Sequence, residues 1–199
     1  MNMAPIRLVV ALPAEAKPLR RHFALRRDQR ASLPLYRQGD TLLAVCGVGS
    51  TAAARAVHWL AAHELERAAQ ALWINVGIAG HPSRSVGEAV LACEIEDQAS
   101  GGRWLTSPPT QPPCALDRLL TLQQPDPAYR WPGLQEMEAA GFYAAARVHA
   151  PAAAVQCLKV VSDNLRQPSH RINGSLVNDL IAGRMEILEH LIRQLQTQT

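Results

Sequence analysis

The sequence predicts an α/β protein, a three-layer αβα sandwich around a mixed, largely parallel central sheet. Short β-rich runs alternate with helical segments along the chain, which is typical of a sheet covered by helices on both faces. The 199 residues are 48% hydrophobic and 19% charged, as in ordinary globular proteins, and show no internal repeat. That length suffices for one sizeable core. We therefore expect residues 1–199 to form a single domain.

Proline and glycine residues mark the ends of the predicted elements in the first half of the chain. Pro13 ends a β-rich run, Gly39-Asp40 is typical of a tight hairpin, and an alanine-rich helix follows Gly47-Val48-Gly49-Ser50. A buried-type strand then runs into Gly77-Ile78-Ala79-Gly80, which we interpret as a second glycine-rich turn. The expected strands are 6–12, 35–38, 41–46 and 71–76, and the expected helices are 14–25 and 51–67.

The second half contains one irregular stretch. We expect a strand at 86–95, a proline-rich segment at 99–133 with one strand at 118–122, and a buried helix at 134–148. Gly141 inside that helix costs about 1 kcal/mol relative to alanine, so something should pack closely against it. A strand at 155–162 and a closing helix from Asn173 or Ser175 complete the chain. Its apolar stripe comprises Val177, Leu180, Ile181, Leu188, Leu191, Ile192 and Leu195.

Composition disfavours several classes of function. The net charge of +3 is mild, and an early arginine cluster fits a solvated helix face better than a phosphate or nucleic-acid patch. The four cysteines form no C-x-x-C pair and the seven histidines no metal-ligand spacing, so we expect neither metal nor cofactor. No apolar run approaches the roughly 18 residues of a membrane span, and no secretion signal is recognisable. We expect a cytoplasmic protein.

Three carboxylates occupy comparable places in the predicted fold. Glu15 follows the first strand, Asp163 ends a late strand, and Glu138 lies on the buried helix beside Glu136. Each has an ordinary explanation, as a first-turn helix residue, a turn residue or a helix-start glutamate. Ligands of open α/β sheets collect at the carboxyl ends of the strands, where the two glycine-rich turns also lie. Together these residues predict a polar pocket.

Six motifs, in order, resemble one family. They are ALPAEA (11–16), CGVGSTAAA (46–54), INVGIAG (74–80), GEAVLA (87–92), EMEAAGFY (136–143) and VVSD (160–163). This series is similar to the nucleoside phosphorylase and nucleosidase superfamily, particularly its methylthioadenosine/S-adenosylhomocysteine nucleosidase branch. The similarity covers most of the chain outside 99–133, a segment shorter than its family equivalent.

The resemblance implies a role for each acidic residue. Glu138 would hold the ribose hydroxyls, with Met137 packing on the sugar and the Glu136 backbone nearby. Asp163 would protonate the purine at N7 while the N-glycosidic bond breaks, and Glu15 would help to activate water. The remaining predicted contacts to substrate come from the glycine-rich segments, at Gly49, Ser50, Ala79 and Gly80.

Several alternatives stay open at this stage. The first turn lacks the glycine and arginine common in phosphate-using relatives, so we favour hydrolysis over phosphorolysis of a purine nucleoside or thionucleoside. A catalytically silent nucleoside-binding relative is the next alternative. A nicotinamide-dependent dehydrogenase is remote, because the G-x-G-x-x-A segment is followed by a strand with Asn75 rather than an acidic residue.

Parts of the base pocket cannot be assigned from the sequence. The aromatic residue that stacks on the purine in the family has no clear counterpart, and Trp104, Tyr129 and Trp131 are candidates only by their position in the chain. His81 stands where the family usually has glycine. A partner subunit could complete such a pocket, so we expect a homodimer.

Overall fold

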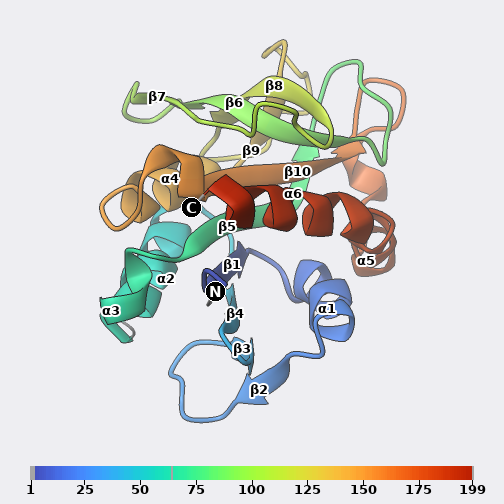
Figure 1. The fold of residues 1–199 in the computed structure, drawn as a ribbon. Coiled ribbons are helices and arrows are strands. Elements are labelled where there is room, and N and C mark those ends of the chain that lie inside the picture. The colour runs from blue at the N-terminus through green and yellow to red at the C-terminus, as the bar shows by residue number, and fades with distance from the viewer. Residues whose placement is uncertain (1–2, 64, 199) are drawn as a thin grey trace.

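The computed structural model describes residues 3–63 and 65–198, and within them ten strands form one mixed sheet (Figure 1). The strand order is β10-β6-β8-β9-β5-β1-β4-β3-β2, with β7 paired to β6. The strands are β1 Ile6–Val10, β2 Arg26–Asp28, β3 Leu35–Gln38, β4 Thr41–Val45, β5 Leu72–Gly80, β6 Ala89–Asp97, β7 Arg103–Leu105, β8 Ala115–Thr121, β9 Leu134–Glu136 and β10 Val155–Asp163.

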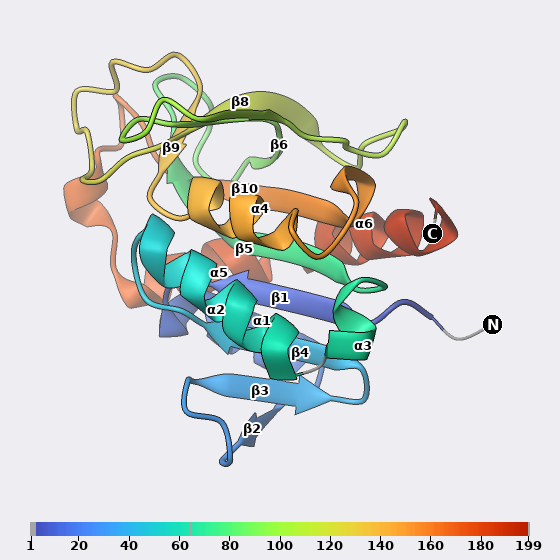
Figure 2. The same cartoon turned by 90° about the vertical axis from the view of Figure 1, so that its left-hand side faces the viewer.

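Helices lie on both sides of the central strands (Figures 1 and 2). They are α1 Pro13–His22, α2 Ser50–His63, α3 Leu65–Ala68, α4 Ala139–Ala146, α5 Gly174–Ala182 and α6 Met185–Gln198, with 3-10 turns η1 Ala152–Ala154 and η2 Ser169–Arg171. In Figure 2, α2, α3 and α4 face the viewer, whereas α1, α5 and α6 lie behind the sheet. This arrangement confirms the predicted α/β fold.

The strands of β4-β1-β5-β10 run parallel to one another, and so do those of β6-β8-β9. Strand β10 also pairs with β6, so β5, β10, β6, β8 and β9 close into a ring. The sequence did not indicate this closure, because it depends on pairings between segments far apart in the chain. Each strand of this ring is paired with two others of the ring, which leaves β7, paired with β6, as the edge strand beside it.

The predicted hairpin at Gly39-Asp40 is confirmed by antiparallel β3 and β4. The closing stripe is also buried as expected, with Leu188 and Leu191 fully inaccessible and Leu180 partly exposed. Two helices, α5 and α6, share that stripe instead of one. Asn173 caps the start of α5 by accepting hydrogen bonds from Ser175 N and Leu176 N, each at 3.0 Å.

The helix predicted at 134–148 is wrong at its start. Residues 134–136 form strand β9, which pairs with β5 and β8, and α4 begins only at Ala139. Pairing within the closed ring therefore outweighs the helical composition of this segment. Gly141 is closely packed as predicted, because a Cβ there would stand 2.0 Å from the backbone oxygen of Ser50 on α2.

Three smaller expectations also need correction. The segment 77–80 is not a turn but the end of β5, and β2 and β7 are strands that were not predicted. The helix predicted at 51–67 is represented by α2 and α3, and residue 64 lies outside the described residues. None of the described helices is long and apolar enough to cross a membrane.

Candidate functional site

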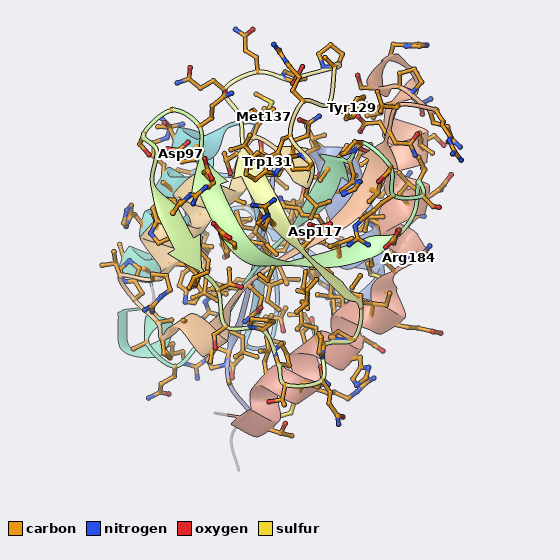
Figure 3. The ribbon with its side chains drawn as sticks, turned by 90° about the horizontal axis from the view of Figure 1, so that it is seen from above. Asp97, Asp117, Tyr129, Trp131, Met137 and Arg184 are labelled. Carbon is orange, nitrogen blue, oxygen red and sulfur yellow. The ribbon has the colours of Figure 1, made fainter. Side chains whose placement is uncertain are left out.

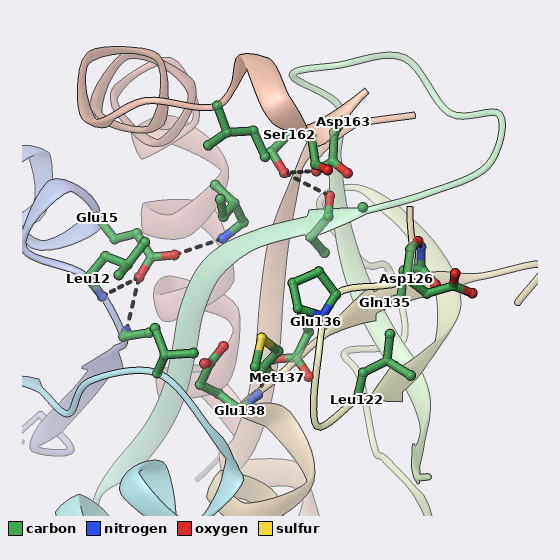
Figure 4. Close-up of a pocket in the computed structure, with 18 residues that line it drawn as sticks. Leu12, Glu15, Leu122, Asp126, Gln135, Glu136, Met137, Glu138, Ser162 and Asp163 are labelled. Carbon is green, nitrogen blue, oxygen red and sulfur yellow. Dashed lines mark hydrogen bonds between the residues drawn. The ribbon is translucent and has the colours of Figure 1, made fainter. Parts of the chain in front are cut away.

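A cavity of about 190 Å³ lies where the parallel strands β1, β4, β5 and β10 end (Figure 4). Polar groups from separate parts of the chain meet there, as expected for the carboxyl ends of strands in an α/β sheet. The lining residues are Ala11, Leu12, Glu15, Val48, Ile78, Ala79, Gly80, Leu122, Pro125, Asp126, Gln135, Glu136, Met137, Glu138, Ser162, Asp163, Ser169 and Ile172.

Glu15 is held rigidly by backbone donors. It lies in the first turn of α1 and is buried, with Oε2 accepting hydrogen bonds from Leu12 N at 2.8 Å and Ala11 N at 3.0 Å. Its Oε1 accepts from Ile78 N at 3.0 Å. Burial raises the pKa of Glu15, and the backbone hydrogen bonds oppose that rise only in part. The side chain is thus a fixed acceptor at one end of the cavity.

Glu136 has a larger role than the sequence suggested. Its carboxylate accepts from Glu138 N and Ala139 N, both at 2.9 Å, so it caps the start of α4. Thr121 Oγ1 donates to Oε1 at 2.8 Å, and Lys159 Nζ donates to Oε2 at 2.8 Å. The side chain of Glu136 therefore fixes the strand-to-helix turn that carries Met137 and Glu138.

Lys159 is a residue of the site that sequence reasoning missed. It is 1% exposed in the middle of β10 and also donates to Asn75 Oδ1 at 2.6 Å. Burial by itself would lower its pKa, but Glu136 and Glu138 outweigh that effect, so the pKa is raised and the ammonium stays charged. A lysine inside the apolar run VQCLKVVS was the available signal, because a fully buried lysine needs a paired charge.

Glu138 precedes the first residue of α4, and its Oε1 accepts from Gly49 N at 2.7 Å. Burial and, next to it, the nearby Glu136 carboxylate raise the pKa of Glu138 to about 7, although Lys159 opposes part of this rise. Glu138 can therefore exchange a proton near neutral pH. The segment after β4 thus contacts this acid directly.

Asp163 ends β10, at a register shift between Val161 and Asp163 where β10 pairs with β5. Ser162 Oγ donates to its Oδ1 and the Tyr129 hydroxyl donates to its Oδ2. A Cβ at Gly80 would stand 2.9 Å from the same Oδ2, so glycine is needed for this close approach. Asp163 is buried and held by hydroxyl donors on both oxygens.

The three aromatic candidates lie in different surroundings. Tyr129 is buried and contacts Asp163, whereas Trp104 lies in β7 and pairs with Ile95 of β6. Trp131, which Figure 3 labels together with Tyr129, packs against the Arg118 guanidinium at 5.1 Å from the ring centroid. None of the three is among the described residues that line the cavity. Among the described residues, the lining of the cavity therefore includes no Phe, Trp or Tyr, and the Tyr129 hydroxyl bonds to Asp163.

Most predicted site residues line one cavity. Glu15, Glu138 and Asp163 meet there from separate parts of the chain, and Glu136, Met137, Ala79 and Gly80 also line the cavity. Gly49 and Ser50 are not among the lining residues: the Gly49 N–H donates to Glu138, and Ser50 packs against Gly141. Their chemical roles stay predictions.

The histidines, the cysteines and Asn75 are the residues on which other chemistries would depend. Among the described residues, no three His, Cys, Asp or Glu side chains are grouped as metal ligands would be. The four cysteines are free thiols, of which only Cys157 is fully buried. Asn75, the position that a dehydrogenase would use near its cofactor, is instead inside β5 and donates to Val9 O at 3.0 Å.

The fold is that of the nucleoside phosphorylases and nucleosidases, as comparison with solved structures shows. A 5′-methylthioadenosine nucleosidase from Arabidopsis thaliana superimposes with a TM-score of 0.80 at 18% identity, covering 98% of this chain and 97% of that chain. The Streptococcus pneumoniae MTA/SAH nucleosidase in complex with 8-aminoadenine gives 0.75 at 18%, covering 96% and 99%. A Helicobacter pylori 5′-methylthioadenosine/S-adenosylhomocysteine nucleosidase gives 0.75 at 12%, covering 97% and 99%.

Sequence comparisons add nothing to this similarity. No family model matches the chain, and no curated protein matches it. The resemblance in motifs is thus accompanied by a common fold over nearly the whole chain at low identity.

Proposed function

We propose that this protein hydrolyses the N-glycosidic bond of a purine nucleoside or thionucleoside, releasing the free base and the sugar. The observation that carries this proposal is the meeting of Glu15, Glu138 and Asp163 around one cavity. Glycosidic hydrolysis needs an acid for the leaving group and a base for water, around a transition state that resembles an oxocarbenium ion. The solved structures with this fold that are named above are nucleosidases.

Each of the three acidic residues has one role in this mechanism. Glu138 accepts hydrogen bonds from the sugar hydroxyls, and Met137 packs against the sugar. Asp163 transfers a proton to the base as the glycosidic bond breaks, so the base leaves as a neutral molecule. Glu15, anchored by three backbone N–H groups, accepts a proton from the attacking water.

Water is favoured over phosphate as the nucleophile because of local charge. Glu138 accepts the Gly49 N–H, a group that could otherwise bind an anion after a strand end. Among the described residues that line the cavity there is no arginine or lysine. The Lys159 ammonium group is already bonded to Glu136 and Asn75, so a phosphate beside Glu15 and Glu138 would meet no cation among the described lining residues, which disfavours phosphorolysis.

The first test is an assay for free base with methylthioadenosine, S-adenosylhomocysteine, adenosine and inosine, each with and without phosphate. We expect base release that does not require phosphate. Asp163→Asn keeps the shape of the side chain without a transferable carboxyl proton, so its rate should fall about 10²–10⁴-fold. A panel without turnover, or an Asp163→Asn variant with a near-normal rate, would leave the silent nucleoside-binding relative as the better proposal.

We also propose that the protein works as a homodimer in the cytoplasm. Val48 lines the cavity yet is 53% exposed, which suits coverage by a second subunit. Light scattering at assay concentration tests the assembly, and a fully active monomer would contradict it. Cell fractionation tests the location.

A further inference from the structure

Gln135 combines two features that an ordinary structural glutamine need not share. It lines the cavity and is only 7% exposed, and its carbonyl oxygen Oε1 is buried without a hydrogen-bond partner among the described residues. A buried acceptor without a partner is costly, and such groups in a binding cavity often serve a ligand. Gln135 has no part in the mechanism above.

The orientation of this amide follows from its other contact. Gln135 Nε2 donates to the backbone oxygen of Asp126 at 2.9 Å. Rotating the amide by 180° would bring two carbonyl oxygens together, so the nitrogen is fixed and the oxygen is the free atom. The buried oxygen Oε1 of Gln135 therefore needs a hydrogen-bond donor.

Gln135 lies on the same side of the cavity as the proposed acid. In the sheet it is the register partner of Gly80, and a Cβ at Gly80 would stand 2.9 Å from Asp163 Oδ2. Glu15 lies apart from it, on the segment that follows β1 (Figure 4). The side chain thus lies at the end of the cavity where the base would bind, next to the apolar Leu122 and Pro125.

We infer that Gln135 is a specificity-determining residue whose carbonyl oxygen accepts a hydrogen bond from an N–H group on the six-membered ring of the base. This inference rests on the proposed nucleoside site and names what that site selects. A ring with an amino substituent or a protonated ring nitrogen satisfies Oε1. A ring without such a donor leaves Gln135 Oε1 unpaired, and a site built to form a hydrogen bond binds such a ring more weakly.

Binding of free bases tests this without requiring turnover. Calorimetry with adenine, hypoxanthine and unsubstituted purine compares an amino donor, a ring N–H donor and a six-membered ring with neither. We expect the wild-type protein to bind adenine, hypoxanthine or both roughly five- to hundredfold tighter than purine. This comparison needs no variant, so it does not depend on whether a mutant folds.

The matched pair of variants is Gln135→Met and Gln156→Met. Gln156 is also a buried glutamine whose Nε2 donates to backbone oxygens and whose Oε1 lacks a partner, but it does not line the cavity. Gln135→Met should lose most of the discrimination while purine affinity changes by no more than about twofold. Gln156→Met should keep the wild-type ratio.

Each outcome decides the inference. A second cavity of about 670 Å³ shares Gln135, Leu122, Pro125 and Asp126 with the first, and water held there could satisfy Oε1 instead. In that case wild-type protein would bind all three bases alike, or Gln135→Met would retain the wild-type ratio, and either result overturns the inference. If none of the three bases binds to the wild-type protein, the inference is also overturned. Discrimination that Gln135→Met abolishes, with no nucleoside hydrolysed, would support the inference while refuting the proposed hydrolysis.

Discussion

Replacing Glu138 by glutamine should remove a specific pH dependence of folding stability. Burial and the neighbouring Glu136 raise the pKa of Glu138 from 4.5 to about 7 in the folded protein. The folded state then holds this proton more tightly than the unfolded chain does. Stability from this group is therefore complete below about pH 4.5 and is lost as the pH rises through 7.

The size of the effect follows from the pKa difference. Each unit of pKa difference between the folded and unfolded states corresponds to about 1.36 kcal/mol. The rise in the pKa of Glu138 from 4.5 to about 7 therefore amounts to about 3 kcal/mol of folding stability, which is lost when Glu138 ionises. Glutamine has no such proton, and its amide oxygen can still accept from Gly49 N. Between pH 5 and 8, the stability of wild type should fall by about 2–3 kcal/mol more than that of Glu138→Gln.

Urea unfolding of both proteins at several pH values measures this difference. Groups whose shifted pKa values do not involve Glu138, among them His81 and His149, are present in both proteins and cancel in the comparison. Glu186→Gln, an exposed glutamate on α6, is the control and should follow wild type. Parallel stability curves for wild type and Glu138→Gln would refute the reasoning, because Glu138 would then titrate alike in the folded and unfolded states.

Three further predictions follow from single contacts. Lys159→Met should destabilise the protein by about 3–5 kcal/mol at pH 7 in urea unfolding, because Glu136 keeps a buried charge without its cation; a loss below about 1 kcal/mol would contradict this. Gly141→Ala should cost more than about 2 kcal/mol, since its Cβ would meet the Ser50 backbone at 2.0 Å, whereas Gly174→Ala, with its nearest atom at 3.8 Å, should cost little. Tyr129→Phe should lower kcat about tenfold or more with little change in KM, because Asp163 loses a hydroxyl donor. The control is Tyr143→Phe, which should leave kcat unchanged because the Tyr143 hydroxyl bonds to Leu105 O and not to Asp163. Equal kcat values for the two phenylalanine variants would exclude a positioning role for Tyr129.

Local patterns in the sequence determined much of the architecture. Gly39-Asp40 specified its hairpin, and Asn173 specified a helix start, because turn and cap preferences act within a few residues. The sequence also indicated that one strand ends shortly before Glu15 and another at about Asp163. This was enough to predict that both carboxylates lie at the same edge of a parallel sheet. These features depend on neighbours in the chain.

Tertiary structure decided the features that depend on distant partners. Residues 134–136 have helical composition but form β9, because β5 and β8 supply strand pairing on both sides. Lys159 becomes part of the site only because Asn75 and Glu136 come from other strands to meet its ammonium group. The sequence shows the charge, but not its partner.

The contact between Tyr129 and Asp163 has the same origin. The two residues are 34 positions apart, and no local pattern links a loop tyrosine with the end of β10. The sequence by itself determined which carboxylates stand at strand ends, since that follows from local order along the chain. Only the closed ring and the loop folded beside it decided which donors hold those carboxylates, because these contacts form between segments that the chain order leaves independent.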